Sequence, residues 1–199
     1  MQGLYALKPW YSRRLQLFTD AAVRRGLSPD LFTAVGVLFA GVAALVIWQG
    51  WWWAALPALA LRLAGANLDG AVARARGVSR PWGFVLNEIG DRSSDLLMFA
   101  GLAALAARHH DSWEHVDVLL VLVAALAATL PTFASLSAAG AGATRRNGGP
   151  FGKTERCLVV VVATAFPGLM PWWAGIVVVG SLLTATTRFA AAHRELSEA

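Results

Sequence analysis

Charge is scarce in this sequence. Asp, Glu, Lys and Arg make up 15% of its 199 residues, whereas apolar residues make up 57%, and the mean hydropathy is +0.54. A soluble domain carries about 25% charged residues, so this chain cannot coat a water-facing surface, and lipid must be part of its solvent. Cysteine is almost absent as well: Cys157 stands alone, which excludes an intrachain disulfide.

Long uncharged intervals predict six transmembrane helices. A helix needs about 20 mostly apolar residues to cross a bilayer. Residues 31–61 and 157–187 are each 31 residues without charge, and each is interrupted, by QGWWW at 49–53 and by FPGLMPWW at 166–173. Each interval therefore fits two helices joined by a short turn. Residues 118–144 fit one more helix with a kink at Pro131, and residues 83–107 supply the remaining one.

The residues before the first span predict a helix that lies on the membrane surface. Tyr11, Leu15, Phe18 and Ala22 recur at helical spacing among arginines, and arginines on such a helix meet anionic head groups. We therefore expect an all-α integral membrane protein. An amphipathic interfacial helix would occupy residues 1–28, and a membrane domain of six transmembrane helices would occupy residues 29–199.

The basic residues predict how this domain is oriented. If six spans place both termini on one side, that side carries fourteen Lys and Arg residues and the other carries Arg108 alone. By the positive-inside rule, both termini and the acids described below face the cytoplasm. The net charge of +5 is thus explained by topology, and we expect no nucleic-acid partner. The fourteen residues are Lys8, Arg13, Arg14, Arg24, Arg25, Arg74, Arg76, Arg80, Arg145, Arg146, Lys153, Arg156, Arg188 and Arg194.

Acidic residues stand directly before an apolar run that is too short to span a membrane. The run covers residues 96–107, only 12 residues, so its helix must extend backward through Asp95 and Asp91. The preceding helix has the same shortage, because residues 51–61 number 11, and it must continue through Arg62 toward Asp69. Charged side chains at membrane depth usually face a cavity and serve a function.

The spacing of these acids predicts a cation site. Asn87, Asp91 and Asp95 are four residues apart and share one helix face. The connection at 74–81 allows the two helices to run antiparallel, so Asp69 and Asp91 can meet. Carboxylates held together need a cation, and Mg²⁺ or Mn²⁺ suits oxygen ligands. A second interpretation is that the acids only neutralise arginines: Arg62, Arg74 and Arg92, with Glu88 able to pair with Arg92.

One segment resembles a family signature. LDGAVARARGVSRPWGFVLNEIGD, residues 68–91, resembles D-x2-D-G-x2-A-R-x8-G-x3-D-x3-D of the CDP-alcohol phosphatidyltransferases. The following DRSSD bears a weaker likeness to actinobacterial phosphatidylinositol-phosphate synthases. Six positions fall in register without a gap: Asp69, Gly70, Ala73, Arg74, Gly83 and Asp91.

The resemblance implies a membrane transferase of phospholipid biosynthesis. Such an enzyme moves the substituted phosphate of a CDP-alcohol, here expected to be CDP-diacylglycerol, to the hydroxyl of a small alcohol acceptor and releases CMP. Its cofactor would be Mg²⁺ or Mn²⁺, and the family implies a homodimer. By resemblance, Asp69 is a metal ligand, whereas Asp91 is both a ligand and the general base. Gly70, Ala73, Arg74 and Gly83 would form the nucleotide pocket.

Two positions depart from the signature. The first Asp falls on Ala66 and the third on Asn87, whereas four acids in the family hold a pair of divalent cations. In one interpretation Asp95, Asn67 or Glu88 joins Asn87 to complete a rearranged site, which could hold one metal. In a second, the enzyme is slow and specialised. In another, the protein binds a nucleotide-lipid or a partner enzyme without turnover.

The loop before the fifth span is basic and rich in glycine. TRRNGGPFGKTER, residues 144–156, offers cations that can clamp a phosphate on the acceptor, although a basic cytoplasmic loop without any ligand explains it equally well. The candidate clamp residues are Arg145, Arg146, Lys153 and Arg156.

Two further interpretations concern the remaining polar residues. A transporter would use carboxylates as ion ligands, but its acids belong near the bilayer midplane rather than at helix ends. RHHDSWEH, residues 108–115, fits an exposed polar turn better than a metal site.

Overall fold

The computed structural model describes residue 11 and residues 13–198, and every regular element in these residues is a helix. The predicted surface helix over residues 1–28 lies partly outside the described residues. Within them, α2 spans Gln16–Arg24, buries Ala22 and leaves Leu17 and Phe18 exposed. It packs against α4, and the Tyr11 hydroxyl donates to the Ala60 carbonyl at 3.2 Å.

Three long helices form the first half of the bundle: α3 (Pro29–Trp48), α4 (Trp52–Ala75) and α5 (Pro81–His109). The Ser28 hydroxyl caps α3 by accepting from the amide of Asp30. Gly50, in the turn between α3 and α4, has a φ of 76° that favours glycine. Both α4 and α5 extend through their charged residues, as the short apolar runs predicted.

Glycines let α3 approach α4 and α5 closely. A Cβ atom added to Gly65 of α4 would lie 2.8 Å from Gly36 of α3 and 2.7 Å from the Phe32 carbonyl oxygen. A Cβ added to Gly101 of α5 would lie 2.5 Å from the carbonyl oxygen of Ala44. Small residues at such crossings allow backbone-to-backbone packing, which drives helix association in lipid. This packing fixes where the polar ends of α4 and α5 stand.

The second half contains three short helices, a 3₁₀ turn and one long helix: α6 (Val116–Ala127), α7 (Leu130–Gly140), α8 (Lys153–Ala165), η2 (Pro167–Leu169) and α9 (Met170–Ser197). The span predicted over residues 118–144, with a kink at Pro131, corresponds to the segment Val116–Gly140. The chain forms two helices interrupted at Ala128 and Thr129, and Pro131 lies in the first turn of α7. Proline lacks an N–H group, and a first turn leaves that group unbonded anyway.

Within residues 13–198, three helical segments are long and apolar enough to cross a membrane: Pro29–Trp48, Val116–Gly140 and Pro167–Ser197. The helices α4 and α5 are long but carry several charged residues, and α8 has only 13 residues. Length and hydropathy therefore support a membrane protein, and the number of six spans stays a prediction.

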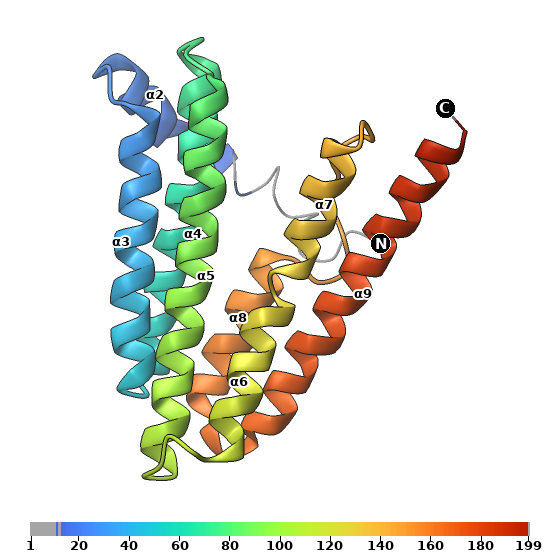
Figure 1. Ribbon diagram of the computed structural model, residues 1–199. Coiled ribbons are helices and arrows are strands. Elements are labelled where there is room, and N and C mark those ends of the chain that lie inside the picture. The colour runs from blue at the N-terminus through green and yellow to red at the C-terminus, as the bar shows by residue number, and fades with distance from the viewer. Residues whose placement is uncertain (1–10, 12, 199) are drawn as a thin grey trace.

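The two ends of the bundle differ in character. Figure 1 shows α2, the α4–α5 connection and the last turns of α7 and α9 at one end, with the α3–α4 turn and the α5–α6 loop at the other. The tryptophan-rich turn (residues 49–53) and the histidine loop (residues 108–115) thus lie at the same end of the bundle. The signature segment, at the end of α4 and the start of α5, lies at the opposite end.

Candidate functional site

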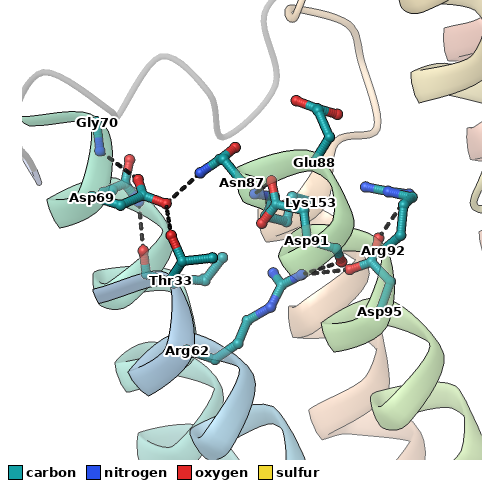
Figure 2. A network of polar contacts seen from close by, with 12 residues as sticks. Thr33, Arg62, Asp69, Gly70, Asn87, Glu88, Asp91, Arg92, Asp95 and Lys153 are labelled. Carbon is teal, nitrogen blue, oxygen red and sulfur yellow. Dashed lines mark hydrogen bonds and ion pairs between the residues drawn. The ribbon is translucent and has the colours of Figure 1, made fainter. Parts of the chain in front are cut away.

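Asp69, on α4, is the centre of a polar cluster between three helices. Its carboxylate is buried and accepts a hydrogen bond from the Thr33 hydroxyl of α3 at 2.9 Å. It also accepts from the side-chain amide of Asn87 on α5 and from the backbone N–H of Gly70. Figure 2 shows these three donors converging on Asp69. The predicted pairing of α4 with α5 at this position is therefore observed.

A cavity of about 660 Å³ opens beside this cluster. Its walls come from the start of α3, the end of α4, the α4–α5 connection and the start of α5. An exposed ion pair between Arg80 and Asp30 lies among the lining residues. All four predicted nucleotide-binding residues line the cavity together with Ala66, Asp69 and Asn87: they are Gly70, Ala73, Arg74 and Gly83.

Asp91 has different partners from Asp69. Its carboxylate forms an ion pair with the ammonium of Lys153, the first residue of α8. Its main-chain oxygen accepts from Arg62 at 3.4 Å. Asn87 lies one helical turn before Asp91 and bonds to Asp69, so α5 connects the two acids. None of the hydrogen bonds among the described residues joins Asp69 to Asp91 directly.

Asp95 lies deeper and is surrounded by arginines. One carboxylate oxygen is 2.6 Å from Arg62 Nη2, and the other is 2.8 Å from Arg156 Nη2 and 3.1 Å from Arg92 Nη1. The side chains of Asp95, Arg62 and Arg156 are all buried. The interpretation that acids neutralise arginines thus describes Asp95. Glu88 pairs with Arg145 rather than with Arg92, because α5 directs it toward the loop before α8.

Each of the four predicted phosphate-clamp residues faces a carboxylate. Lys153 contacts Asp91 and Arg156 contacts Asp95, as described above. Arg145 pairs with Glu88 and also lies 4.5 Å from the centre of the Phe84 ring. Arg146 lies 3.3 Å from Glu195 of α9. The four basic side chains lie around the same loop, but an anionic acceptor has to compete with the acids that already pair with these basic side chains.

Sequence reasoning missed Arg188, which shapes this loop from α9. Its buried guanidinium donates to the carbonyl oxygens of Gly148 at 3.0 Å, Asn147 at 2.7 Å and Pro131 at 2.6 Å. It also donates to the Ser135 hydroxyl at 3.0 Å. A lone arginine following an apolar stretch was a signal, but its partners are carbonyl groups, which no side-chain pattern reveals.

The side-chain oxygen atoms of Asp69 and Asn87 are suitable ligands for a single hard divalent cation. Among the described residues no cationic side chain forms a salt bridge with Asp69, although the carboxylate is buried at the edge of the cavity. The Asn87 amide now presents its nitrogen to Asp69, and a half turn of the amide would present its oxygen instead. Carboxylate and amide oxygens are ligands that Mg²⁺ and Mn²⁺ accept. Ala66 contributes a methyl group and no ligand.

The histidine loop forms its own cluster at the other end of the bundle. His110 Nε2 lies 2.8 Å from Asp117, and His115 Nδ1 accepts from the Asp117 backbone N–H at 3.2 Å, which caps α6. The ligand atoms of these three residues lie within 4.8 Å of one another. The two imidazole rings are stacked with centroids 3.4 Å apart, so their in-plane lone pairs do not converge on one point. This geometry suits a cap better than a metal site.

Comparison with known proteins gives one family. The model of the CDP-alcohol phosphatidyltransferases matches residues 27–186. A phosphatidylinositol phosphate synthase of Mycolicibacterium smegmatis is 31% identical over 181 residues, which cover 86% of this chain and 79% of that protein. A phosphatidylinositol phosphate synthase of Streptomyces avermitilis is 28% identical, and the matched region covers 100% of this chain and 85% of that protein.

Solved structures agree with these relatives. The Mycobacterium tuberculosis phosphatidylinositol phosphate synthase PgsA1 with CDP-DAG bound matches with a TM-score of 0.75 and 25% identity, covering 90% of this chain and 94% of that one. The same enzyme in complex with manganese and citrate matches with a TM-score of 0.72 and 25% identity, covering 88% and 87%.

Proposed function

The chain belongs to the CDP-alcohol phosphatidyltransferase family, and we propose that it transfers the phosphatidyl group of CDP-diacylglycerol to a small alcohol with release of CMP. The observation that carries this proposal is the cavity beside Asp69. The four signature residues other than the acids all line it, and none of them has a bulky apolar side chain that would fill it. A relative of similar fold binds CDP-DAG.

The reaction breaks the phosphoanhydride bond of the diphosphate and forms a phosphodiester bond to the acceptor. The acceptor oxygen forms a bond to the phosphorus of the phosphatidyl group, the bond between that phosphorus and the CMP oxygen breaks, and the acceptor proton moves to a base. We assign the base to Asp91, whose Oδ1 has no partner among the described contacts while Lys153 bonds Oδ2. A positioned base contributes about 10²- to 10⁴-fold to such a rate.

Asp69 and Asn87 would hold the divalent ion, and Asp91, one helical turn beyond Asn87, would serve as the base. When bound, such an ion withdraws charge from the diphosphate and stabilises the leaving CMP. Arg74, one helical turn beyond Gly70 on the cavity wall, would contact the nucleotide phosphates. Asp95 would not bind the ion: its salt bridges hold α4, α5 and α8 together.

The acceptor proposed here is a phosphorylated small alcohol. The salt bridges near this loop join six basic residues to four acids. The basic residues are Arg62, Arg92, Arg145, Arg146, Lys153 and Arg156, and the acids are Glu88, Asp91, Asp95 and Glu195. The excess of two positive charges favours an anion. The named relatives, which are phosphatidylinositol phosphate synthases, support the same class.

CMP release tests the proposal. The full chain in lipid nanodiscs with CDP-diacylglycerol and Mn²⁺ should release CMP with a phosphorylated polyol and much less with glycerol or serine. Asp91→Asn should reduce the rate at least a hundredfold. If the chain binds CDP-diacylglycerol but releases no CMP with any acceptor, the proposal is contradicted.

The substitutions at Ala66 and Asn87 favour a second candidate, a protein that binds the nucleotide-lipid without turnover. The double variant Ala66→Asp/Asn87→Asp separates the two. If the natural protein is inactive and this variant binds metal more tightly, the site is vestigial. If the natural protein is active and the variant loses activity, the site has been rebuilt around fewer acids.

The topology proposed for this function has six spans, with α6 and α7 forming one, and places the site and both termini in the cytoplasm. Labelling of single cysteines in intact cells checks it, because the natural Cys157 is buried. A membrane-impermeant maleimide should label Ser112→Cys in the histidine loop from outside. It should label Thr144→Cys only after lysis, and labelling of Thr144→Cys in intact cells would reverse the orientation.

A further inference from the structure

The carboxylates near the cavity differ in whether a cation already neutralises them. Helices α3, α4 and α5 carry five carboxylates, and four of these form salt bridges with Lys or Arg. In the described part of the chain, Asp69 alone among the five has no salt bridge. The four neutralised acids are Asp30 with Arg80, Glu88 with Arg145, Asp91 with Lys153, and Asp95 with Arg62, Arg92 and Arg156.

Lys153 is fixed beside Asp91 by the fold rather than carried by a mobile loop. It is the first residue of α8, and α8 packs against both α4 and α5. The Asp91 side chain is 12% exposed and that of Lys153 is 27% exposed, so water screens this pair only in part. An ammonium is a compact point charge, which makes lysine the side chain most similar to a bound cation.

Two acids of the signature are missing at the cavity that Asp69 lines. Positions 66 and 87 carry Ala and Asn where the signature has Asp, so two negative charges are gone from the shared face of α4 and α5. The charge left without a partner is that of Asp69, and the adjacent Asn87 can supply an uncharged oxygen. This balance suits one divalent ion and disfavours two, because divalent ions close together repel strongly unless several carboxylates surround them.

We propose that Lys153 takes the place of a second divalent ion beside Asp91, so that the chain binds one divalent ion, at Asp69 and Asn87. The proposal rests on the proposed function for the presence of that ion. Lys153 belongs to α8 and lies outside the signature segment, so this role could not be found from the signature residues. Lys153 neutralises and positions Asp91, while the single ion acts on the diphosphate.

Counting bound Mn²⁺ tests this directly and needs no turnover. The full chain in nanodiscs is titrated with Mn²⁺ alone and then with Mn²⁺ plus CDP-diacylglycerol, and the free ion is followed by electron paramagnetic resonance. One Mn²⁺ per chain is expected in both titrations. Asp69→Asn should weaken this binding at least tenfold. Two ions bound to the natural protein, or none in either titration, would overturn the proposal.

Variants at Lys153 show whether its charge excludes the second ion. Asn87→Asp restores an acid while keeping the lysine and should still bind one Mn²⁺. Asn87→Asp/Lys153→Met removes the ammonium at nearly constant volume and should bind two. Asn87→Asp/Arg145→Gln is the matched control, since it removes a cation whose partner is Glu88 rather than Asp91, and it should bind one.

The outcomes separate this inference from the proposed function. A chain that releases CMP yet binds two Mn²⁺ overturns the role of Lys153 and leaves the transferase intact. A chain that binds one Mn²⁺ but releases no CMP supports the ion count and contradicts the transferase. If the Lys153→Met double variant binds one ion, or the Arg145→Gln control binds two, the ammonium does not stand in for an ion.

Discussion

The buried charges around Asp95 should be the most sensitive point of the bundle. Asp95 is 3% exposed, and its two oxygens contact three guanidinium groups at 2.6, 2.8 and 3.1 Å. Asp95→Asn keeps the size of the side chain and removes its charge. It leaves Arg62 and Arg156 buried without a counter-ion, because each is within 3% of full burial. Breaking a buried pair by removing one partner costs about 3–5 kcal/mol.

Because Asp95 has three arginine partners, removing its charge should destabilise the protein more than removing one arginine. Arg62→Met should cost less than Asp95→Asn, since Asp95 keeps Arg156 and Arg92 as partners. For a chain of this length, about 2–4 °C per kcal/mol converts the Asp95→Asn effect to a fall in Tm on the order of 10 °C. Thermal unfolding of the purified chain in one detergent, followed by the fluorescence of its tryptophans, measures the ordering of the variants.

A matched control uses a more exposed pair on the same helix. Glu88→Gln breaks the ion pair with Arg145, whose side chain is 27% exposed, and partly exposed pairs contribute only about 0–1 kcal/mol. Its Tm should therefore change by no more than a few degrees. If Asp95→Asn is as stable as Glu88→Gln, or if Arg62→Met is the more damaging change, the reasoning about uncompensated buried charge is wrong.

Three further outcomes are expected. Gly65→Ala should lower the Tm, because the added Cβ would lie 2.7 Å from a backbone oxygen. Gly41→Ala should leave the Tm unchanged, because no atom lies within 4 Å of its added Cβ. Equal Tm values for the two variants would contradict the close packing of α3 and α4. Arg188→Met should raise the KM for the acceptor more than that for CDP-diacylglycerol, because this arginine holds the carbonyl groups of the loop before α8; steady-state kinetics with each substrate varied decides this. EDTA should abolish CMP release and Mn²⁺ should restore it, while activity that persists in EDTA would exclude a required divalent ion.

The helical, lipid-facing character of the protein could be predicted from composition alone. So could the extension of α4 through Arg62 and of α5 through Asp91, because a helix must reach a minimum length to cross a bilayer. Asp69, Gly70, Ala73 and Arg74 line one cavity because residues at helical intervals on α4 share a face whatever the partner helix is, whereas Gly83 reaches the cavity from α5.

Tertiary structure decided which charges meet. The sequence suggested that Glu88 pairs with Arg92 and that Asp95 joins the metal site, because only neighbours one helical turn apart are visible along a chain. In the folded protein Glu88 meets Arg145, Asp95 meets Arg156, and Asp91 meets Lys153, each from a helix or loop 57 to 62 residues away. Helix packing sets these pairs. A one-dimensional pattern fixes the face on which a charge lies, whereas its counter-ion depends on which helix the fold brings to that face.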